Sequence, residues 1–546
     1  MSPSLPRRFE GLLEPGAYPH PIDGVELITT PISWVLLAGE YAYKIKRPVR
    51  YSFIDLTSRE RRRFLCGEEA RLNRRFAPEL YLDVCKVVSA AGAARMEAPD
   101  PARQSSESAG ERGCGGDAGA VLDYAVRMRR FSRAEELDRL LDGHRIEPHE
   151  LETFGHELAR IHAGLPAASL TSSWGRPDDI QAQLLQNLLE CADAAAVFDS
   201  SDQILALRNR MQEKLTAGAT WMAARRSHGR IRECHGDLHS RNIVRLRGRL
   251  VAFDCLEYEP AWRWIDTVDE IAFLTSDLKA RARPLHAQAF RGGYLAESGD
   301  FQGCRLLGLY EAHRALVRAK VAALSASQSG QAATQEALRR EHFRLVTFAA
   351  AALAPKMPRL LLMSGLSGSG KTWLARQLAE RLSAVHIRSD VERKRHAGLR
   401  EVARSRSGLG EDLYSAEATE SVYAELARAA QDVLSGGIAA IVDATFLERA
   451  QRARFAELAR SCGAPLHLIL CEAPEPVLRA RIVERGRMRH DASEADLDVL
   501  AWQSARAEPP AADEPIAVIR VDTARPDALA LTLRRIGDPS GGTNQP

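Results

Sequence analysis

Two short segments rich in phosphate-binding residue types restrict the fold of this chain more than any other feature. Residues 235–242 read His-Gly-Asp-Leu-His-Ser-Arg-Asn, and an apolar step soon afterwards ends at Asp254. Residues 365–372 read Gly-Leu-Ser-Gly-Ser-Gly-Lys-Thr and follow an apolar run. Each pattern is a way of holding a magnesium-bound nucleotide, and the two occur in unrelated folds. The sequence therefore predicts two phosphotransferase modules joined end to end.

Length and charge narrow the class of partner. With 546 residues the chain is too long for a single hydrophobic core. Its 75 Lys and Arg residues nearly balance its 72 Asp and Glu residues, so the net charge is only +3. That balance gives no support for binding to nucleic acid or to a membrane surface through bulk charge. We therefore expect small-molecule acceptors as partners, and the sequence carries no signal of oligomeric state.

The cysteines and the first residues of the chain favour the cytoplasm. The nine cysteines are dispersed, without a C-x-x-C pair or metal-ligand spacing, which is typical of reduced thiols. The amino terminus lacks the apolar core of a signal peptide. No run approaches ~18 apolar residues, the length that would span a bilayer. These features predict a cytoplasmic, soluble protein without a membrane span.

The order of strand and helix patterns predicts an α+β, bilobal, protein-kinase-like domain. Residues 32–49 read as a hairpin, and residues 57–76 read as a helix that Thr57 and Glu60 would begin as a capping box. Further patterns are strands at 81–89 and 120–129 and helices at 133–226 and up to about 350. A small β-rich lobe before a larger helical lobe is the order found in kinase-like folds.

Composition predicts the domain boundaries. Residues 97–119 are rich in Gly, Ser and charge, which predicts a disordered loop. The two prolines within 354–358 break a helix, and the strand–glycine loop–helix pattern beyond them predicts an α/β P-loop NTPase domain with a parallel sheet. The expected organisation is a first domain at 1–350, a linker at 351–358, a second domain at 359–536 and a disordered tail at 537–546.

The first motif carries the residue types that phosphoryl transfer requires. Transfer from ATP needs a group that orients and deprotonates the acceptor hydroxyl, together with ligands for Mg²⁺. At this spacing we expect Asp237 to face the acceptor, and Asn242 and Asp254 to bind the metal. We expect His235 to brace the loop and His239 to face solvent.

Such a site also needs a cation on the phosphates and a carboxylate that holds the cation. Lys44 and Lys46 lie on one face of their predicted strand, because side chains alternate along a strand. Either lysine could bind phosphate, and we favour Lys44. In the helix at 57–76 both Glu68 and Glu69 could be the partner, and we favour Glu69.

These residues resemble those of the aminoglycoside phosphotransferase family, which phosphorylates hydroxyls of small molecules on a kinase-like fold. The resemblance covers roughly residues 25–330, and it is strongest at Lys44, Glu69, Asp237, Asn242 and Asp254. It implies an ATP cleft between two lobes, with adenine against the segment near 128–131. One departure is that no obvious glycine-rich loop covers the phosphates, since Ala38-Gly39-Glu40 is a thin substitute.

The acceptor of this first site is left open by the sequence. Arg314 and Arg318 share one face of a predicted helix. If that face lines the acceptor pocket, an anionic acceptor would suit it better than an aminoglycoside. A solvated or salt-bridged helix face is an equal alternative.

The second motif is a full G-x-x-x-x-G-K-T sequence between a predicted buried strand and a predicted helix. Its glycines allow backbone N–H groups to converge on phosphate, Lys371 would reach the β and γ oxygens, and the Thr372 hydroxyl would bind Mg²⁺. The helix that begins there directs its positive end at the same anion. The expected nucleotide-binding residues are Gly365, Ser367, Gly368, Ser369, Gly370, Lys371 and Thr372.

Residues beyond this loop predict a kinase. Asp390 ends a second predicted strand and could accept the proton of an acceptor hydroxyl, with Arg393 and Lys394 holding an anionic substrate. Asp443 ends a third apolar strand and could hold Mg²⁺ through water. We expect five arginines between 479 and 489 to form a mobile lid, in which Arg485 and Arg489 would be catalytic.

The stretch 359–535 resembles the small P-loop kinases that include gluconate kinase, the kinase half of polynucleotide kinase and the zeta toxins. Together, the two resemblances predict a bifunctional phosphotransferase with ATP and Mg²⁺ as cofactors, each domain acting on a hydroxyl of a sugar, amino sugar or similar molecule. One alternative is a regulatory protein whose P-loop domain binds or hydrolyses ATP to gate the first domain. Another is a toxin-like or polynucleotide-type kinase.

Overall fold

The structure is a computed structural model that describes residues 5–51, 54–90, 92–97, 120–399, 415–488 and 495–537. Residues 98–119 of the loop predicted at 97–119, residues 538–546 of the tail predicted at 537–546, and the predicted lid residue Arg489 lie outside these ranges. Backbone contacts divide the chain into two compact units. The first consists of Met1–Ile146, Leu165–Trp174 and Ile231–Ile265, and the second of Glu147–Gly164, Gly175–Arg230 and Asp266–Pro546. This division falls inside the predicted first domain, since the helices after 146 and the P-loop region belong to one unit.

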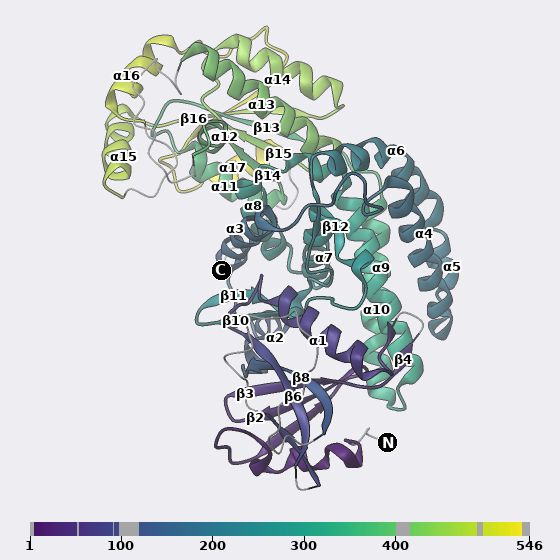
Figure 1. Ribbon diagram of the computed structural model, residues 1–546. Coiled ribbons are helices and arrows are strands. Elements are labelled where there is room, and N and C mark those ends of the chain that lie inside the picture. The colour runs from purple at the N-terminus through teal and green to yellow at the C-terminus, as the bar shows by residue number, and fades with distance from the viewer. Residues whose placement is uncertain are drawn as a thin grey trace. The chain divides into compact units, whose positions relative to one another are not determined.

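The first unit is built on a six-stranded antiparallel sheet in the order β1-β2-β3-β8-β6-β7 (Figure 1). Its strands are β1 (Val25–Thr29), β2 (Ser33–Ala38), β3 (Tyr41–Lys46), β6 (Tyr81–Ala90), β7 (Ala93–Met96) and β8 (Val121–Arg129). One face of the sheet packs on Phe9 and Leu12 of the 3-10 helix η1 (Arg7–Leu13), and the other face packs on Cys66 of helix α1 (Arg59–Asn73). The predicted hairpin at 32–49 is β2 and β3.

Helix α1 begins one residue later than a Thr57 cap would place it. The Ser58 hydroxyl accepts a hydrogen bond from the Arg61 backbone N–H at 3.1 Å, which makes Ser58 the N-cap. Thr57 instead donates to Asp55 at 2.6 Å. The Thr57–Glu60 capping box was therefore wrong, because a neighbouring carboxylate competes for the Thr57 hydroxyl.

The rest of the first unit carries the loop at residues 235–242. The elements are β4 (Arg50–Tyr51), β5 (Ile54–Asp55), α2 (Leu137–Asp142), β9 (Ile231–Glu233), η6 (Ser240–Asn242), β10 (Ile243–Leu246), β11 (Arg249–Ala252) and β12 (Trp264–Asp266). Strands β10 and β11 form a hairpin in which Ile243 pairs with Ala252. The loop at 235–242 enters this hairpin, and Asp254 follows its second strand.

The second unit contains a set of helices and a parallel sheet. The helices before the sheet are α3 (Pro148–Gly164), α4 (Pro177–Ala194), α5 (Ser201–Leu205), α6 (Arg208–Ser227), α7 (Thr267–Ala280), α8 (Pro284–Ser298), α9 (Cys304–Gln328) and α10 (Ala332–Leu353). Arg225 of α6 is fully buried between Asp266 and Asp300, and it donates four hydrogen bonds of 2.7–2.8 Å to their carboxylates. No helix in the described ranges is long and apolar enough to cross a membrane.

The parallel sheet has the order β14-β15-β13-β16-β17, as a P-loop NTPase fold requires. Its strands are β13 (Leu360–Ser364), β14 (Val385–Arg388), β15 (Ala440–Asp443), β16 (Leu466–Glu472) and β17 (Ala517–Asp522). Its helices are α11 (Lys371–Leu382), α12 (Ser389–His396), α13 (Ala416–Ser435), α14 (Arg449–Ser461), α15 (Glu475–Met488), α16 (Leu497–Arg506) and α17 (Ala528–Arg535). The predicted fold class, a kinase-like domain followed by a parallel α/β domain, is confirmed.

Polar contacts join the helices to this α/β region inside the second unit. Arg291 of α8 is buried and donates to the carbonyl of Ser383 at 2.7 Å and to that of Ala384 at 3.4 Å, at the start of β14. Arg305 of α9 pairs with Asp432 of α13 at 2.5 Å. The helices and the sheet therefore pack as one body.

Candidate active sites

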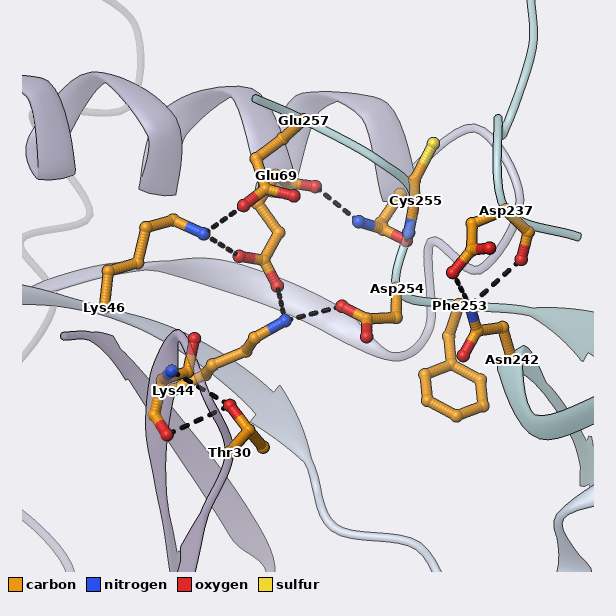
Figure 2. A network of polar contacts seen from close by, with 12 residues as sticks. Thr30, Lys44, Lys46, Glu69, Asp237, Asn242, Phe253, Asp254, Cys255 and Glu257 are labelled. Carbon is orange, nitrogen blue, oxygen red and sulfur yellow. Dashed lines mark hydrogen bonds and ion pairs between the residues drawn. The ribbon is translucent and has the colours of Figure 1, made fainter. Parts of the chain in front are cut away.

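The first candidate site is centred on Lys44, whose ammonium lies between two carboxylates (Figure 2). Its Nζ is 2.8 Å from Glu69 Oε1 and 2.5 Å from Asp254 Oδ1. Burial alone would lower the pKa of Lys44, but the adjacent carboxylates of Asp254 and Glu69 raise it well above its usual range. Lys44 is thus a fixed cation, and the structure brings together three residues that the sequence places far apart.

Lys46 reaches the same carboxylate from two residues further along β3. Its Nζ is 2.7 Å from Glu69 Oε2, and it also donates to Glu257 Oε1. The Lys46 side chain is only 1% exposed, whereas that of Lys44 is 12% exposed. The sequence leaves the choice between the two lysines open, and the exposure of their side chains shows that Lys44 is the one that a ligand can reach.

The loop at residues 235–242 holds Asp237 and Asn242 together. The Asn242 side-chain amide donates to the Asp237 carboxylate at 2.8 Å and to the Asp237 backbone carbonyl at 3.0 Å. The Asn242 carbonyl accepts from the Phe253 backbone N–H at 2.9 Å, one residue before Asp254. In the view of Figure 2, Asp254 lies between the Lys44 ammonium and the Asp237–Asn242 pair.

His235 braces this loop, as the sequence predicts. Its Nε2 lies 2.9 Å from the Phe253 carbonyl, and its Nδ1 lies 3.4 Å from the Asp237 backbone N–H. The first contact requires a proton on Nε2 and the second requires a lone pair on Nδ1, so both contacts suit the neutral ring. Burial lowers the pKa of His235 to about 4, which keeps the ring neutral at physiological pH.

His239 does not face solvent. The residue is buried, its Nδ1 accepts from the Arg241 backbone N–H, and its Nε2 lies 3.4 Å from Asp237 Oδ2. The expectation of a solvent-facing histidine was wrong because the 3-10 turn η6 folds the ring back onto the loop. The His239 ring therefore lies next to the Asp237 carboxylate.

Asp254 and Asn242 offer oxygen atoms of the kind that Mg²⁺ prefers. Within the described residues, Asp254 Oδ2 and Asn242 Oδ1 accept no hydrogen bond, and the Asp254 side chain is 45% exposed. Asp254 also has a φ of 62°, a backbone conformation uncommon outside glycine, and its N–H donates to the Tyr81 hydroxyl at 3.0 Å. Hard oxygen donors near a lysine that could bind phosphate suit Mg²⁺. Strained backbone is common at functional sites.

The second candidate site is the loop between β13 and α11, where glycine is required for steric reasons. Gly365 has a φ of 134°, and a Cβ placed on it would lie 2.3 Å from the Cys471 carbonyl oxygen. Gly370 has a φ of 82°, and its Cβ would lie 2.9 Å from Thr523 Oγ1. The backbone thus passes very close to β16 and to the loop after β17, so that its N–H groups can form an anion cradle.

The side chains of this loop fit a phosphate ligand. Lys371 folds over the loop and donates to the carbonyls of Gly365 and Leu366, both at 2.8 Å. The Ser369 hydroxyl is buried, and no described residue is its hydrogen-bond partner. Burial lowers the pKa of Lys371, despite the nearby Asp443 carboxylate. A buried cation and an unsatisfied hydroxyl at a helix amino terminus suit a nucleotide phosphate.

Asp443 lies at the carboxyl end of β15 and is held by a histidine from the next strand. His386 Nε2 lies 3.1 Å from Asp443 Oδ2. Burial would raise the pKa of Asp443, but the hydrogen bond from His386, together with the nearby Lys371 and Arg388, outweighs burial and lowers it. Asp443 is therefore available as an anion beside Lys371.

A cavity of about 590 Å³ opens from the P-loop towards α12, α13 and α16. Predicted site residues that line it are Ser367, Gly368, Gly370, Lys371, Thr372, Asp390, Arg393, Asp443 and Arg485. Asp390 lies in the first turn of α12, not at its N-cap, and no described residue bonds to its carboxylate. The geometry thus places a carboxylate that could accept a proton in the same cavity as the phosphate loop.

Two of the predicted cations differ in position. Arg393 lines the cavity, whereas Lys394 is 3% exposed and does not line it, so the pairing of both with one substrate does not follow from the structure. Among the predicted lid arginines, Arg485 donates to the Ala495 carbonyl at 2.9 Å. Arg481, another of the five predicted lid arginines, also lines the cavity and donates to the Gly368 and Thr523 carbonyls.

Other functional positions gave weaker sequence signals. The Gln503 side chain is buried and accepts a hydrogen bond from the Ser367 backbone N–H at 2.8 Å, which ties α16 to the phosphate loop. Glu257 and His386 carried no motif, and only their partners Lys46 and Asp443 could have drawn attention to them.

The arginine face at 310–320 proves to be a salt-bridged one. Arg314 Nη2 lies 2.7 Å from Asp269 Oδ2, and Arg318 Nη2 lies 2.8 Å from Glu341 Oε1. Both guanidinium groups are buried and paired with carboxylates inside the second unit. They therefore give no reason to expect an anionic acceptor.

Comparison with solved structures finds kinases among the chains similar to parts of this one. A gluconokinase from Sinorhizobium meliloti is 20% identical, with 34% of this chain and 96% of that chain covered and a TM-score of 0.24. A choline/ethanolamine kinase family protein from Mesorhizobium loti is 13% identical, with 60% and 92% covered and a TM-score of 0.29.

Curated relatives and family models cover both regions. Uncharacterized proteins of Mycobacterium tuberculosis and Mycobacterium bovis are 29% identical over 489 residues, which is 89% of this chain and 92% of each relative. Residues 60–307 match the model described as "Phosphotransferase enzyme family", and residues 360–510 match the model described as "AAA domain". Residues 60–307 thus carry a domain of the phosphotransferase enzyme family, and residues 360–510 carry a P-loop domain of the AAA type.

Proposed function

We propose that the chain is a bifunctional ATP-dependent phosphotransferase, in which each region transfers the γ-phosphoryl group of ATP to a hydroxyl of a small molecule. Both kinds of domain imply the use of ATP. The observation that carries the proposal is that each site brings three kinds of group together. They are a cation that could bind phosphate, oxygen atoms that could bind a metal ion, and an acidic side chain that could accept a proton. We expect a sugar, an amino sugar or a similar compound as acceptor.

In the first site the roles follow from the contacts. Lys44 binds the phosphates, and Glu69 holds Lys44. Asp237 accepts the proton of the acceptor hydroxyl, and the Asn242 amide and His239 orient the Asp237 carboxylate. Asn242 and Asp254 would hold Mg²⁺, which when bound neutralises negative charge on the transferring group.

In the second site the loop at 365–372 holds the triphosphate, and Lys371 leaves its two backbone carbonyls to do so. Asp390 accepts the acceptor proton, and Arg393 and Arg485 stabilise negative charge in the cavity. Thr372 and Asp443 would hold Mg²⁺. Transfer in both sites then depends mainly on positioning and electrostatic stabilisation.

A screen with radiolabelled ATP tests the proposal. Sugars, amino sugars and nucleosides would be offered to the full chain and to its Asp237→Ala and Lys371→Ala variants. We expect labelled products of two kinds, one lost in each variant. If no compound accepts label from either site, the proposed function is wrong.

One observation favours a second candidate function, in which the P-loop region gates the first domain. Arg291 and Arg305 tie the helices of the second unit to the α/β region, so that a structural change around the bound nucleotide could be transmitted to those helices. Asp390→Ala separates the two functions. It should abolish acceptor phosphorylation at the second site, whereas a purely regulatory ATPase would keep its slow ATP hydrolysis and its effect on the first site.

A further inference from the structure

Strand β3 presents two lysines to one side of the sheet, and they divide a single carboxylate between them. Glu69 Oε1 lies 2.8 Å from Lys44, and Glu69 Oε2 lies 2.7 Å from Lys46. Glu69 itself is fully buried. A carboxylate that accepts from two ammonium groups, one on each oxygen, cannot rotate without losing one of them.

Each lysine also forms an ion pair with a second carboxylate, and both of these carboxylates come from one short segment. Lys44 pairs with Asp254, and Lys46 pairs with Glu257 three residues later. Strand β3, helix α1 and the segment 254–257 are therefore joined by two parallel ionic links that meet at Glu69 (Figure 2).

The two links differ in their access to a ligand. The Lys44 link is open, because the side chain of Asp254 is 45% exposed. The Lys46 link is closed, because Lys46 is 1% exposed and Glu257 is 5% exposed. A bound triphosphate can compete for Lys44, whereas Lys46 stays out of its reach.

We propose that Lys46 and Glu257 are positioning residues, which keep Glu69 and the segment carrying Asp254 in place when Lys44 turns from Asp254 to the phosphates of ATP. This inference rests on the proposed function of the first site. Without the closed link, the loss of the Lys44–Asp254 contact on nucleotide binding would leave the segment 254–257 without an ionic tie to β3. The metal ligand Asp254 would then be poorly placed.

The electrostatics agree with this role. Burial would lower the pKa of Lys46, but the carboxylates of Glu257 and Glu69 outweigh burial and raise it, so Lys46 stays a cation, while burial raises the pKa of Glu257. If Lys46 were absent, Glu69 and Glu257 would face each other as buried like charges, which disfavours their present arrangement.

The test measures nucleotide binding by the full chain carrying Lys371→Ala, which silences the second site. Calorimetric titration with ATP, with and without Mg²⁺, would compare Lys46→Met, Glu257→Gln and Lys44→Met in that background. We expect Lys46→Met and Glu257→Gln to weaken Mg·ATP binding about 10- to 100-fold, as outer-shell partners of a metal site usually do. Binding of metal-free ATP should change less, because Lys44 keeps its own contact with Glu69 in both variants. Lys44→Met should weaken both.

Arg62→Met is the matched control, because it breaks another buried ion pair between α1 and the sheet. Arg62 lies 2.7 Å from Asp123, and both side chains are buried. This variant should melt at a lower temperature but bind Mg·ATP normally while folded.

The inference is overturned if Lys46→Met and Glu257→Gln bind Mg·ATP as tightly as the parent, or if Arg62→Met loses as much affinity. Glu257→Gln keeps the side-chain size and decides the matter if Lys46→Met does not fold. If Lys44→Met also leaves Mg·ATP binding unchanged, the proposed function of the first site fails instead.

Discussion

Replacement of Gly365 by alanine tests the phosphate loop at the position where the backbone has least freedom. At a φ of 134° an L-residue is strained, which costs on the order of 1–3 kcal/mol. The added Cβ would also lie 2.3 Å from the backbone oxygen of Cys471 in the interior strand β16, an atom that cannot move aside as a flexible side chain could. The loop must therefore shift.

The size of the effect follows from this strain. Since ~1.4 kcal/mol corresponds to a tenfold change in affinity, a cost of 1–3 kcal/mol weakens ATP binding roughly 5- to 150-fold, and the close contact adds to it. Calorimetric titration of Mg·ATP into the full chain, with Lys44→Met silencing the first site, would measure it.

Gly463→Ala is the control for backbone strain alone. Gly463 follows α14 with a φ of 62°, and no heavy atom lies within 4 Å of its added Cβ. We expect it to cost about 1 kcal/mol of folding stability with no change in ATP affinity. If Gly365→Ala binds Mg·ATP as tightly as its parent, this loop is not the phosphate cradle.

Three further outcomes are expected. Asp237→Asn and Asp390→Asn should each lower one of the two label-transfer activities about 10²- to 10⁴-fold while nucleotide affinity changes little; loss of both activities in one variant would contradict two independent sites. Arg225→Met leaves two buried carboxylates unpaired and should cost about 3–5 kcal/mol in urea unfolding, and a cost below ~1 kcal/mol would refute the importance of this pairing. Burial lowers the pKa of His235 to about 4, so that on acidification the unfolded chain binds a proton before the folded chain does. Stability should therefore fall by about 2 kcal/mol between pH ~7.5 and ~5, and His235→Gln should remove that slope if the assignment is right.

Residues that are close in the sequence could be predicted well. The phosphate loop at 365–372 is contiguous, and Asp237, Asn242 and Asp254 lie on one loop and the hairpin after it. Their spacing in the sequence is enough to predict a role for each of them. The choice between Lys44 and Lys46 could not be made from the sequence, because strand alternation places both on one face and only burial distinguishes them.

Contacts between distant segments had no such signal. His386 meets Asp443 because β14 and β15 are parallel neighbours, with Arg388 opposite Asp443. Nothing in either strand specifies that pairing. Glu257 likewise becomes informative only once Lys46 is known to be buried. The division of the chain was also beyond the sequence, since it depends on how α8 packs on the start of β14.

The buried guanidinium of Arg291 bears on how the two proposed activities can be studied separately. Separating the chain near residues 354–358 would take the Ser383 and Ala384 carbonyls away from this side chain and expose the faces by which α8 packs on α11 and β14. Fragments cut at that point would each expose a surface that is covered in the intact chain, and they would tend to aggregate. Point substitutions in an intact polypeptide are the sounder route to assigning each reaction to its own half.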